Sequence, residues 1–302
     1  MIPEDKSLTL IAIYMYICQQ YDSHLKYSCQ RYTNNSNPAF TDQEIMTIYL
    51  FVINQQKYFE IKDIYKFAKE YLHSWFPKLP SYQSFNNRLN NLHETFRILL
   101  EDLFEKYLPI DCDLNISLTD SLPIITCKGR NRKGKVAPEL TAKGYCSTKE
   151  MYYYGMKLHL LGYRRPGSIP FPERISFTSA DINDLTAFKQ SCGDIICNRI
   201  IYGDKIYFDP NYFSEKEQIN NYCMLIPAKL VKGESEFIRN MDKAYNDLYS
   251  KSVSAIRQPV ESFFNWLIQK TSIQIASKVR SIKGLLLHLF GKLAAAFISC
   301  IF

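Results

Sequence analysis

The chain has 302 residues, of which 46% are hydrophobic and 22% charged, a composition typical of a soluble globular protein and not of a disordered or collagen-like one. Lys and Arg outnumber Asp and Glu by 37 to 30, and the excess is concentrated in residues 126–149, which hold seven basic residues and one acid. Nine cysteines stand singly without a C-x-x-C pair, which excludes a disulfide framework and a zinc ribbon and indicates reduced thiols in the cytosol.

The first part of the chain, residues 1–110, has the periodicity of helices. Thr41 and Glu44 form a capping-box pattern ahead of apolar residues that recur at spacings of three and four. A second helix is predicted over 61–76, because the pattern stops at a proline. These elements predict an all-helical N-terminal domain.

A third, long helix is predicted to start at Ser81 or Ser84, either of which can cap it. Its polar face carries Arg88 among several asparagines. A short helix, a Pro-containing turn and a helix rich in Asn and Arg is the layout of a helix-turn-helix, so Arg88 is a candidate contact to DNA. The alternative is the ordinary solvated face of a helical bundle.

From residue 111 the pattern changes to short runs rich in β-branched and aromatic residues. Five strands are predicted, at 116–119, 152–163, 174–178, 200–202 and 222–227, with helices at 184–192, 211–221, 254–270 and 281–300. The first three strands follow one another directly and so are expected to be antiparallel, whereas strands separated by helices are expected to be parallel. Residues 111–302 are therefore predicted to form an α/β domain with a mixed five-stranded sheet flanked by helices.

The segment 284–302 is about as long as a membrane span, so a membrane-anchored protein is a rival interpretation. Lys292 lies in its middle, and a central Lys costs roughly 2.5 to 3.5 kcal/mol on insertion. His288 stands one helical turn before it. We therefore expect a buried C-terminal helix and no membrane partner, and the N-terminus lacks the features of a signal peptide.

Three carboxylates are candidate functional residues because of their positions relative to the predicted elements. Asp120 follows the first strand, Asp204 ends the fourth, and Glu261 lies on the penultimate helix. The first and fourth strands of such a sheet can be central neighbours, so the acids can converge. Clustered carboxylates repel one another unless a cation neutralises them, and oxygen ligands suit Mg²⁺ or Mn²⁺. Two such ions can activate an attacking hydroxyl and stabilise the leaving oxygen of a phosphodiester.

Each acid also has an ordinary structural explanation. Asp120 and Asp204 can be turn residues, and Glu261 can favour the helix dipole. Glu261 is the hardest to explain in this way, because its neighbours are apolar and its carboxylate needs a partner. Arg257, one helical turn earlier, is the expected ion-pair partner.

Six ordered motifs carry a family resemblance: L-P-S-Y-Q-S-F-N-N-R-L, T-D-S-L-P-I, K-G-Y-C-S-T-K-E-M-Y-Y-Y-G-M-K-L-H-L, T-S-A-D-I-N-D, Y-G-D-K-I-Y and R-Q-P-V-E-S-F-F. In these motifs the chain resembles bacterial insertion-sequence transposases of the DDE type, and most of all the nine-eighty-two group of insertion sequences. The resemblance implies an RNase H-like fold and a catalytic, metal-binding triad of Asp120, Asp204 and Glu261. It also implies an enzyme that cuts and joins the ends of its own mobile element with Mg²⁺ or Mn²⁺, with two ions expected.

The expected partners are double-stranded DNA, as terminal inverted repeats and target DNA, and a second copy of the chain on that DNA. The expected place is the bacterial cytosol, in association with the nucleoid. The alternative function is a catalytically inactive relic that only binds DNA.

The basic segment between the first acid and the second strand is predicted to be a mobile loop that grips DNA, with Tyr145 available to stack. Lys157 and His159 share one face of the second strand, and that face is expected to border Asp120. Besides Arg88, the candidate DNA contacts are Lys128, Arg130, Arg132, Lys133, Lys135, Lys143, Lys149, Lys157, Lys205 and Arg257. The alternative for such a charge run is simple solvent exposure.

Overall fold

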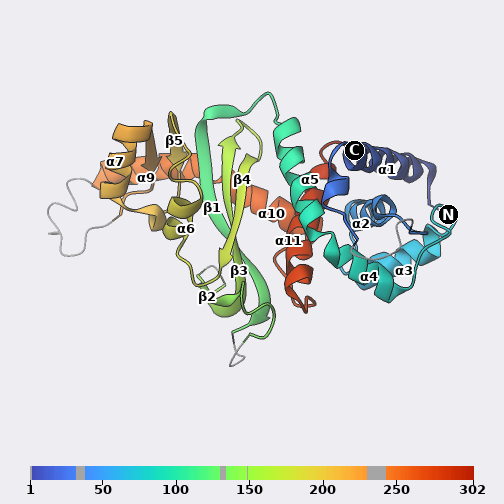
Figure 1. Ribbon diagram of the computed structural model, residues 1–302. Coiled ribbons are helices and arrows are strands. Elements are labelled where there is room, and N and C mark those ends of the chain that lie inside the picture. Colours follow the sequence, from blue (N-terminus) through green and yellow to red (C-terminus); the bar gives the residue numbers. More distant parts are fainter. Residues whose placement is uncertain (1, 32–37, 130–133, 148, 230–242) are drawn as a thin grey trace. The chain divides into compact units, whose positions relative to one another are not determined.

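The computed structural model in Figure 1 describes residues 2–31, 38–129, 134–147, 149–229 and 243–302. The chain divides into two compact units. The first contains Met1–Tyr107, Lys135–Ala137 and Leu267–Phe302, and the second contains Leu108–Gly134 and Pro138–Trp266.

The first unit is helical. Its elements are α1 (Glu4–Ser23), η1 (Leu25–Tyr27), α2 (Asp42–Gln56), α3 (Ile61–Tyr71), α4 (Tyr82–Asn91), α5 (His93–Lys106) and α11 (Ile282–Ile298). Helix α2 is buried at every position from Ile45 to Ile53, so it is surrounded by its neighbours on all sides. It packs against α1, α3 and α11, which makes it the centre of this unit.

The predicted capping box at the start of α2 is confirmed. The Thr41 hydroxyl accepts the backbone N–H of Glu44 at 3.3 Å, and the Glu44 carboxylate accepts the backbone N–H of Thr41 at 2.6 Å. These bonds satisfy two donors that the helix itself leaves unpaired.

Thr41→Ala is expected to lower the free energy of unfolding by about 1 kcal/mol, because it removes one half of this cap. The measurement is urea unfolding followed by circular dichroism. Thr9→Ala is the matched control, since the Thr9 hydroxyl bonds only to the Asp5 carbonyl within α1. Equal stability of the two variants would contradict the prediction.

Two predicted helices of this unit differ from the observed ones. The second helix ends at Tyr71 and not at residue 76, and Leu72–Phe76 continue as turns bonded back to Leu72. The long third helix is interrupted at Leu92, which ends α4 and precedes α5. Ser81 is the N-cap of α4, as one of the two alternatives predicted, and its hydroxyl accepts the Ser84 N–H.

The second unit contains a six-stranded mixed sheet. Its strands are β1 (Asp113–Lys128), β2 (Ala142–Cys146), β3 (Met151–Arg164), β4 (Phe171–Ser179), β5 (Arg199–Tyr202) and β6 (Tyr222–Leu225). Along the sheet the order is β2-β3-β1-β5-β6, and β4 pairs with β3 on the same side as β2. Strands β1 to β4 are joined by antiparallel pairs, whereas β5 is parallel to both β1 and β6. The predicted mixture of antiparallel and parallel strands is confirmed.

The sheet is larger than predicted in two places. Strand β2 was not predicted, and it lies within the basic segment for which a mobile loop was expected. Strand β1 spans 16 residues, where only residues 116–119 were predicted, because Asp120, Ser121 and Pro123 interrupt the apolar alternation of its sequence. Asp120 therefore lies inside a strand and not after one.

The helices of this unit are α6 (Asp184–Ser191), η2 (Lys205–Tyr207), α7 (Pro210–Asn220) and α9 (Lys243–Arg257), followed by α10 (Pro259–Thr271), which begins in this unit and ends in the first. Helices α9 and α10 were predicted as one helix over 254–270. They separate at Gln258, because the following Pro259 has no N–H to continue the helix.

The register of the sheet decides which residues share a face. Thr119 is paired with Leu161, and this face packs on a core that contains Phe188 of α6 and Phe213 of α7. Asp120 is paired with Leu160 and so points to the opposite face, since successive side chains of a strand alternate.

The last helix belongs to the helical unit. The sequence-based division at residue 110 assigned residues 267–302 to the second domain, but α11 packs against α5 and α2, and every residue from Gly291 to Ile298 is buried. A helix that is apolar on all sides needs neighbours on all sides, and α2 and α5 supply them. The predicted buried C-terminal helix is confirmed, and no helix among the described residues has both the length and the hydropathy to cross a bilayer.

Candidate functional site

Asp120 and Asp204 lie near the same end of two neighbouring strands. In the parallel pair of β1 and β5, Leu118 is opposite Tyr202, the last residue of β5. Asp120 follows Leu118 by two residues within β1, whereas Asp204 lies two residues beyond the end of β5 and is the N-cap of η2. The charge of Asp204 is close enough to raise the pKa of Asp120.

Arg257 links Asp120 to Glu261. Its Nη1 donates to Oδ2 of Asp120 at 2.6 Å, and its Nη2 donates to Oε1 of Glu261 at 3.0 Å. Arg257 is the last residue of α9, and Glu261 lies in the first turn of α10, so the break between the helices sets the position of both. The predicted ion pair between Arg257 and Glu261 is confirmed, and the bond to Asp120 was not foreseen.

The guanidinium of Arg257 is not fully satisfied by this bridge. Its Nε is buried and has no hydrogen-bond partner among the described residues. An unsatisfied buried donor costs about 1–3 kcal/mol. The two bonds of the bridge therefore leave one buried donor of Arg257 unpaired within the described part of the chain.

The pKa of Asp120 is raised to about 6, mainly by burial and to a smaller extent by the charges of Asp204 and Asp184, against the opposing effect of Arg257. The backbone N–H of Ser121 also stabilises the carboxylate, at 2.8 Å from Oδ1. A carboxylate with a raised pKa gains from a nearby cation, because the cation offsets both the loss of water and the negative neighbours.

The three acids fit a hard divalent cation by their chemistry. Their carboxylate oxygens are the ligands that Mg²⁺ and Mn²⁺ prefer, and the Arg257 guanidinium already places one positive charge between Asp120 and Glu261. In the part of the chain that the structure describes, no three His, Cys, Asp or Glu side chains are close enough together to hold a metal ion. Asp120 and Glu261 would therefore have to release Arg257 before the three acids could share an ion.

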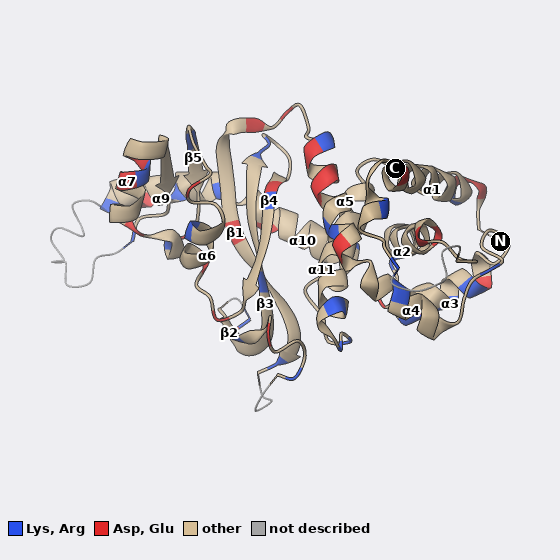
Figure 2. Ribbon diagram, in the orientation of Figure 1, with Lys and Arg blue, Asp and Glu red and all other residues tan. Residues whose placement is uncertain are grey.

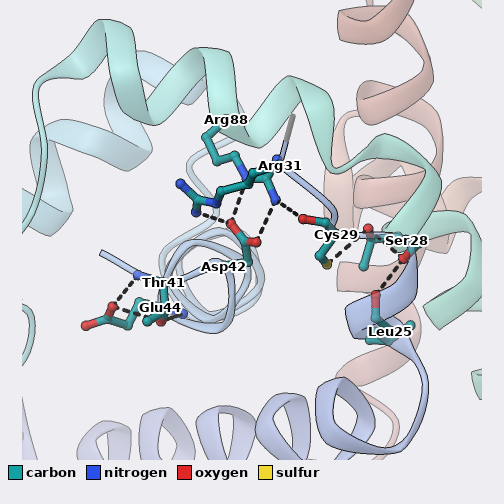
Figure 3. A network of polar contacts seen from close by, with 9 residues as sticks. Leu25, Ser28, Cys29, Arg31, Thr41, Asp42, Glu44 and Arg88 are labelled. Atoms are coloured by element: carbon teal, nitrogen blue, oxygen red, sulfur yellow. Dashed lines mark hydrogen bonds and ion pairs between the residues drawn. The ribbon is translucent and has the colours of Figure 1, made fainter. Parts of the chain in front are cut away.

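Arg88 does not lie on a solvated face of α4, as the DNA-contact prediction requires. Its Nε and Nη2 donate to the two carboxylate oxygens of Asp42, at 2.7 and 2.6 Å, and Nη2 also donates to the Cys29 carbonyl at 2.5 Å. Arg31 binds the same carboxylate at 2.5 Å, as Figure 3 shows. Only 14% of the Arg88 side chain is exposed, so we correct its assignment to a structural ion pair within the helical unit.

Lys157 is also misassigned. As predicted, Lys157 alternates along β3 with apolar residues. Its side chain lies on the face of the sheet that also carries Thr119, whereas Asp120 lies on the opposite face. Its Nζ donates to Asp184 at 2.9 Å and to the Ile182 carbonyl at 2.8 Å, and 15% of its side chain is exposed. Lys157 is therefore a buried partner of Asp184 behind the sheet and not a contact to a DNA phosphate.

Asp184 is the site-adjacent residue that the sequence analysis missed. It is buried in the first turn of α6 and bound to Lys157, and its charge raises the pKa of Asp120 from the opposite face of the sheet. The motif T-S-A-D-I-N-D was noticed, but nothing in it shows that the last Asp is buried. Only the strand register reveals this.

The remaining basic candidates are exposed where the structure describes them. Lys128, Lys135, Lys143, Lys149 and Lys205 have exposed side chains, whereas Arg130, Arg132 and Lys133 lie outside the described residues. The backbone N–H of Lys205 donates to Asp204 at 2.7 Å, so this lysine directly adjoins one of the acids.

No family model matches the chain, and no curated protein matches it. Two solved structures show a distant likeness. One is titled "Mos1 transposase paired-end complex with left transposon end", with 10% identity over 77% of this chain and 81% of that chain and a TM-score of 0.22. The other, "Crystal structure of a pre-cleavage Mos1 transpososome", has 12% identity over 90% and 81% and a TM-score of 0.20. Similarity at these TM-scores carries no argument about this chain.

Proposed function

We propose that this chain is a DDE transposase of the nine-eighty-two group that its motifs resemble, with an RNase H-like second unit. The observation that carries the proposal is the bridge that Arg257 forms between Asp120 and Glu261, beside the end of β5 where Asp204 lies near enough to affect the pKa of Asp120. A sheet of four antiparallel strands followed by two parallel ones, with the acids on β1, after β5 and on the helix beyond, supports the same proposal.

Asp120, Asp204 and Glu261 would hold one or two divalent ions, Mg²⁺ or Mn²⁺. Such ions, when bound, supply activation of the attacking oxygen and stabilisation of the leaving oxygen in phosphodiester cleavage. The backbone N–H groups of Ser121 and Lys205 orient the carboxylates of Asp120 and Asp204, so these two acids are held in place before any substrate arrives. Arg257, once released from the acids, has a planar set of donors that suits a phosphate.

The exposed lysines support DNA as the partner. Lys205 beside Asp204 and the lysines of the basic segment supply positive charge for a duplex, and we propose that they contact the phosphates of element ends and target DNA. We assign recognition of the terminal inverted repeats to the helical unit. Joining two ends requires at least two copies of the chain on DNA, and the expected place is the nucleoid of a bacterial cytosol.

The test is cleavage of a labelled duplex taken from the DNA that flanks this reading frame, with and without Mg²⁺ or Mn²⁺. Metal-dependent nicking at a defined end, absent in an Asp120→Asn protein, is the expected result. Binding of the duplex without nicking in either metal would favour the second candidate, an inactive relic that only binds DNA. Absence of both binding and nicking would contradict the proposal altogether.

A further inference from the structure

Two tyrosines stand exposed next to one another on the hairpin of β2 and β3. Tyr145 and Tyr152 are directly opposite in the antiparallel pair, their ring centroids are 5.0 Å apart, and the rings meet at 57°. The exposed fractions are 52% for Tyr145 and 57% for Tyr152. More than half of each large aromatic residue is thus open to solvent, although an aromatic pair on a hairpin usually serves to cover apolar surface.

The pair is surrounded by positive charge. The Nζ of Lys143 lies 4.9 Å from the centroid of the Tyr152 ring, on the same face of the hairpin. The exposed Lys128 is the last residue of β1, and the exposed Lys149 lies in the turn between β2 and β3; Figure 2 shows the basic residues of this end of the sheet. This surface therefore suits a partner that is both anionic and aromatic.

The hairpin itself is firmly built, so the exposure of the rings is a fixed feature. Its other face packs Cys146 and Tyr153 against Ala180 in a small core. A Cβ at Gly144 would lie 2.5 Å from the Ala180 carbonyl oxygen, and a Cβ at Gly155 would lie 1.9 Å from that of Ile124. Only glycine permits these approaches, which hold the backbone of the hairpin against the rest of the sheet.

The tyrosines lie on the face of the sheet that carries Asp120. Leu160 of β3 is paired with Asp120, and Tyr152 is eight residues before Leu160, an even number that returns the side chain to the same face. Between them Met156, Leu158 and Leu160 are buried, with exposed fractions of 5%, 0% and 1%. The open surface at the tyrosines is therefore separate from the surface at Asp120.

We propose that Tyr145 and Tyr152, with Lys143 beside them, form a platform that stacks an unpaired DNA base. The inference rests on the proposed function in taking DNA as the partner, and adds that the bound DNA is locally unpaired. Bases in a duplex are stacked on both faces and offer no ring to a side chain, whereas an unpaired base offers its whole π face. Lysines alone would suffice for the phosphates of a duplex, and the exposed rings add binding only to an unpaired base.

The experiment measures binding of the full-length protein to a single-stranded 20-nucleotide DNA that contains 2-aminopurine, and to the corresponding duplex, without divalent metal. Tyr152→Leu and Tyr145→Leu are expected to weaken single-strand binding by about 5- to 100-fold, the range for loss of one stacked base, and to change duplex binding less than twofold. Tyr152→Phe and Tyr145→Phe keep the ring and are expected to bind as the wild type does. In the wild-type complex, 2-aminopurine fluorescence is expected to be quenched by stacking.

Three outcomes would overturn the platform: Leu variants that bind the single strand as well as the wild type, equal loss of single-strand and duplex binding, or no quenching in the wild-type complex. The last measurement needs no variant, so it remains decisive even where a Leu variant folds poorly. Because no metal is present, the result is independent of cleavage. A protein that shows the platform but never cuts DNA contradicts the proposed function alone, and a protein that cuts without the platform contradicts this inference alone.

Discussion

Asp204→Asn is expected to reduce metal-dependent cleavage by about 100- to 1,000-fold or more while leaving DNA binding and the free energy of unfolding nearly unchanged. The Asp204 side chain is exposed, and its main contact within the protein is the backbone N–H of Lys205 at 2.7 Å. An amide oxygen accepts this N–H as well as a carboxylate does, so the turn after β5 is retained. The amide lacks the negative charge that a divalent cation requires.

The matched control is Asp194→Asn, in which an exposed aspartate that pairs with Lys216 is changed in the same way. Cleavage is measured on the flanking duplex and binding on the same DNA without metal. If Asp204→Asn lost binding to the same extent as cleavage, the residue would be a DNA contact or a structural residue and not a metal ligand. If it cut normally, the triad would be wrong.

Lys292→Met is expected to raise the free energy of unfolding at pH 6, because it removes a charge from the interior of the helical unit. The side chain is 3% exposed, and its ammonium has the Ser272 carbonyl at 3.3 Å and the Phe59 ring at 5.7 Å as neighbours. Burial lowers the pKa of Lys292 from 10.5 to about 7, against a small opposing effect of Glu60. One pKa unit corresponds to about 1.4 kcal/mol, so the gain at pH 6 is on the order of 5 kcal/mol.

The stability advantage of Lys292→Met over the wild type is expected to decrease as the pH rises. Between about pH 7 and 10.5 the unfolded chain binds a proton at Lys292 that the folded chain has released, so this residue makes the wild type more stable as the pH rises. The advantage of Lys292→Met should therefore shrink to about 1–2 kcal/mol at pH 9.5. Chemical unfolding at both pH values measures it.

Lys283→Met serves as the control for this pH dependence, since Lys283 is an exposed residue of the same helix that bonds to Asn91. It is expected to change stability little at either pH. A Lys292→Met protein no more stable than the wild type at pH 6 would show that the ammonium keeps its hydration in the folded chain.

The three acids could be selected from the sequence because each lies next to a recognisable end of a predicted strand or helix. Asp120 and Asp204 adjoin two β-rich runs, and Glu261 follows a proline that starts a helix, so a map of elements was enough to select them as candidates. The Arg257 bond to Glu261 follows from the four-residue spacing on a helix surface. Its bond to Asp120 joins residues 137 positions apart and depends on how the helices α9 and α10 lie against the sheet, which no local pattern encodes.

The errors have a common physical origin in tertiary contacts. The alternation of Lys157 with apolar residues was predicted correctly, but the face on which it lies was not. Only the pairing register between β1 and β3 shows which of the two faces carries Asp120. Arg88 was taken for a solvent-facing residue because its helix is rich in Asn, whereas its partner Asp42 lies 46 residues earlier. Strand β2 was missed because a basic, glycine-containing segment does not have the composition of a strand, and its pairing with β3 provides the stability that its sequence lacks.

The helical unit is discontinuous in the chain: Leu267–Phe302 complete a structure whose other helices precede Leu108. During synthesis, the ribosome therefore produces α2 and α5 long before α11, which covers them. At 5–20 residues per second, the delay between the end of α5 and the end of α11 is roughly 10 to 40 s. Throughout that time the apolar surface of α2 and α5 that α11 covers is exposed in the nascent chain, so chaperones that bind apolar segments have a long opportunity to act on this protein.

A second consequence concerns the order in which the two units can fold. Strands β1 to β6 are all synthesised before α11, so the sheet that carries Asp120 and Asp204 can form while the helical unit is still incomplete. A chain released early by the ribosome would have the sheet without a finished helical unit. Quality control of abortive chains by proteolysis should thus begin at the exposed surfaces of α2 and α5.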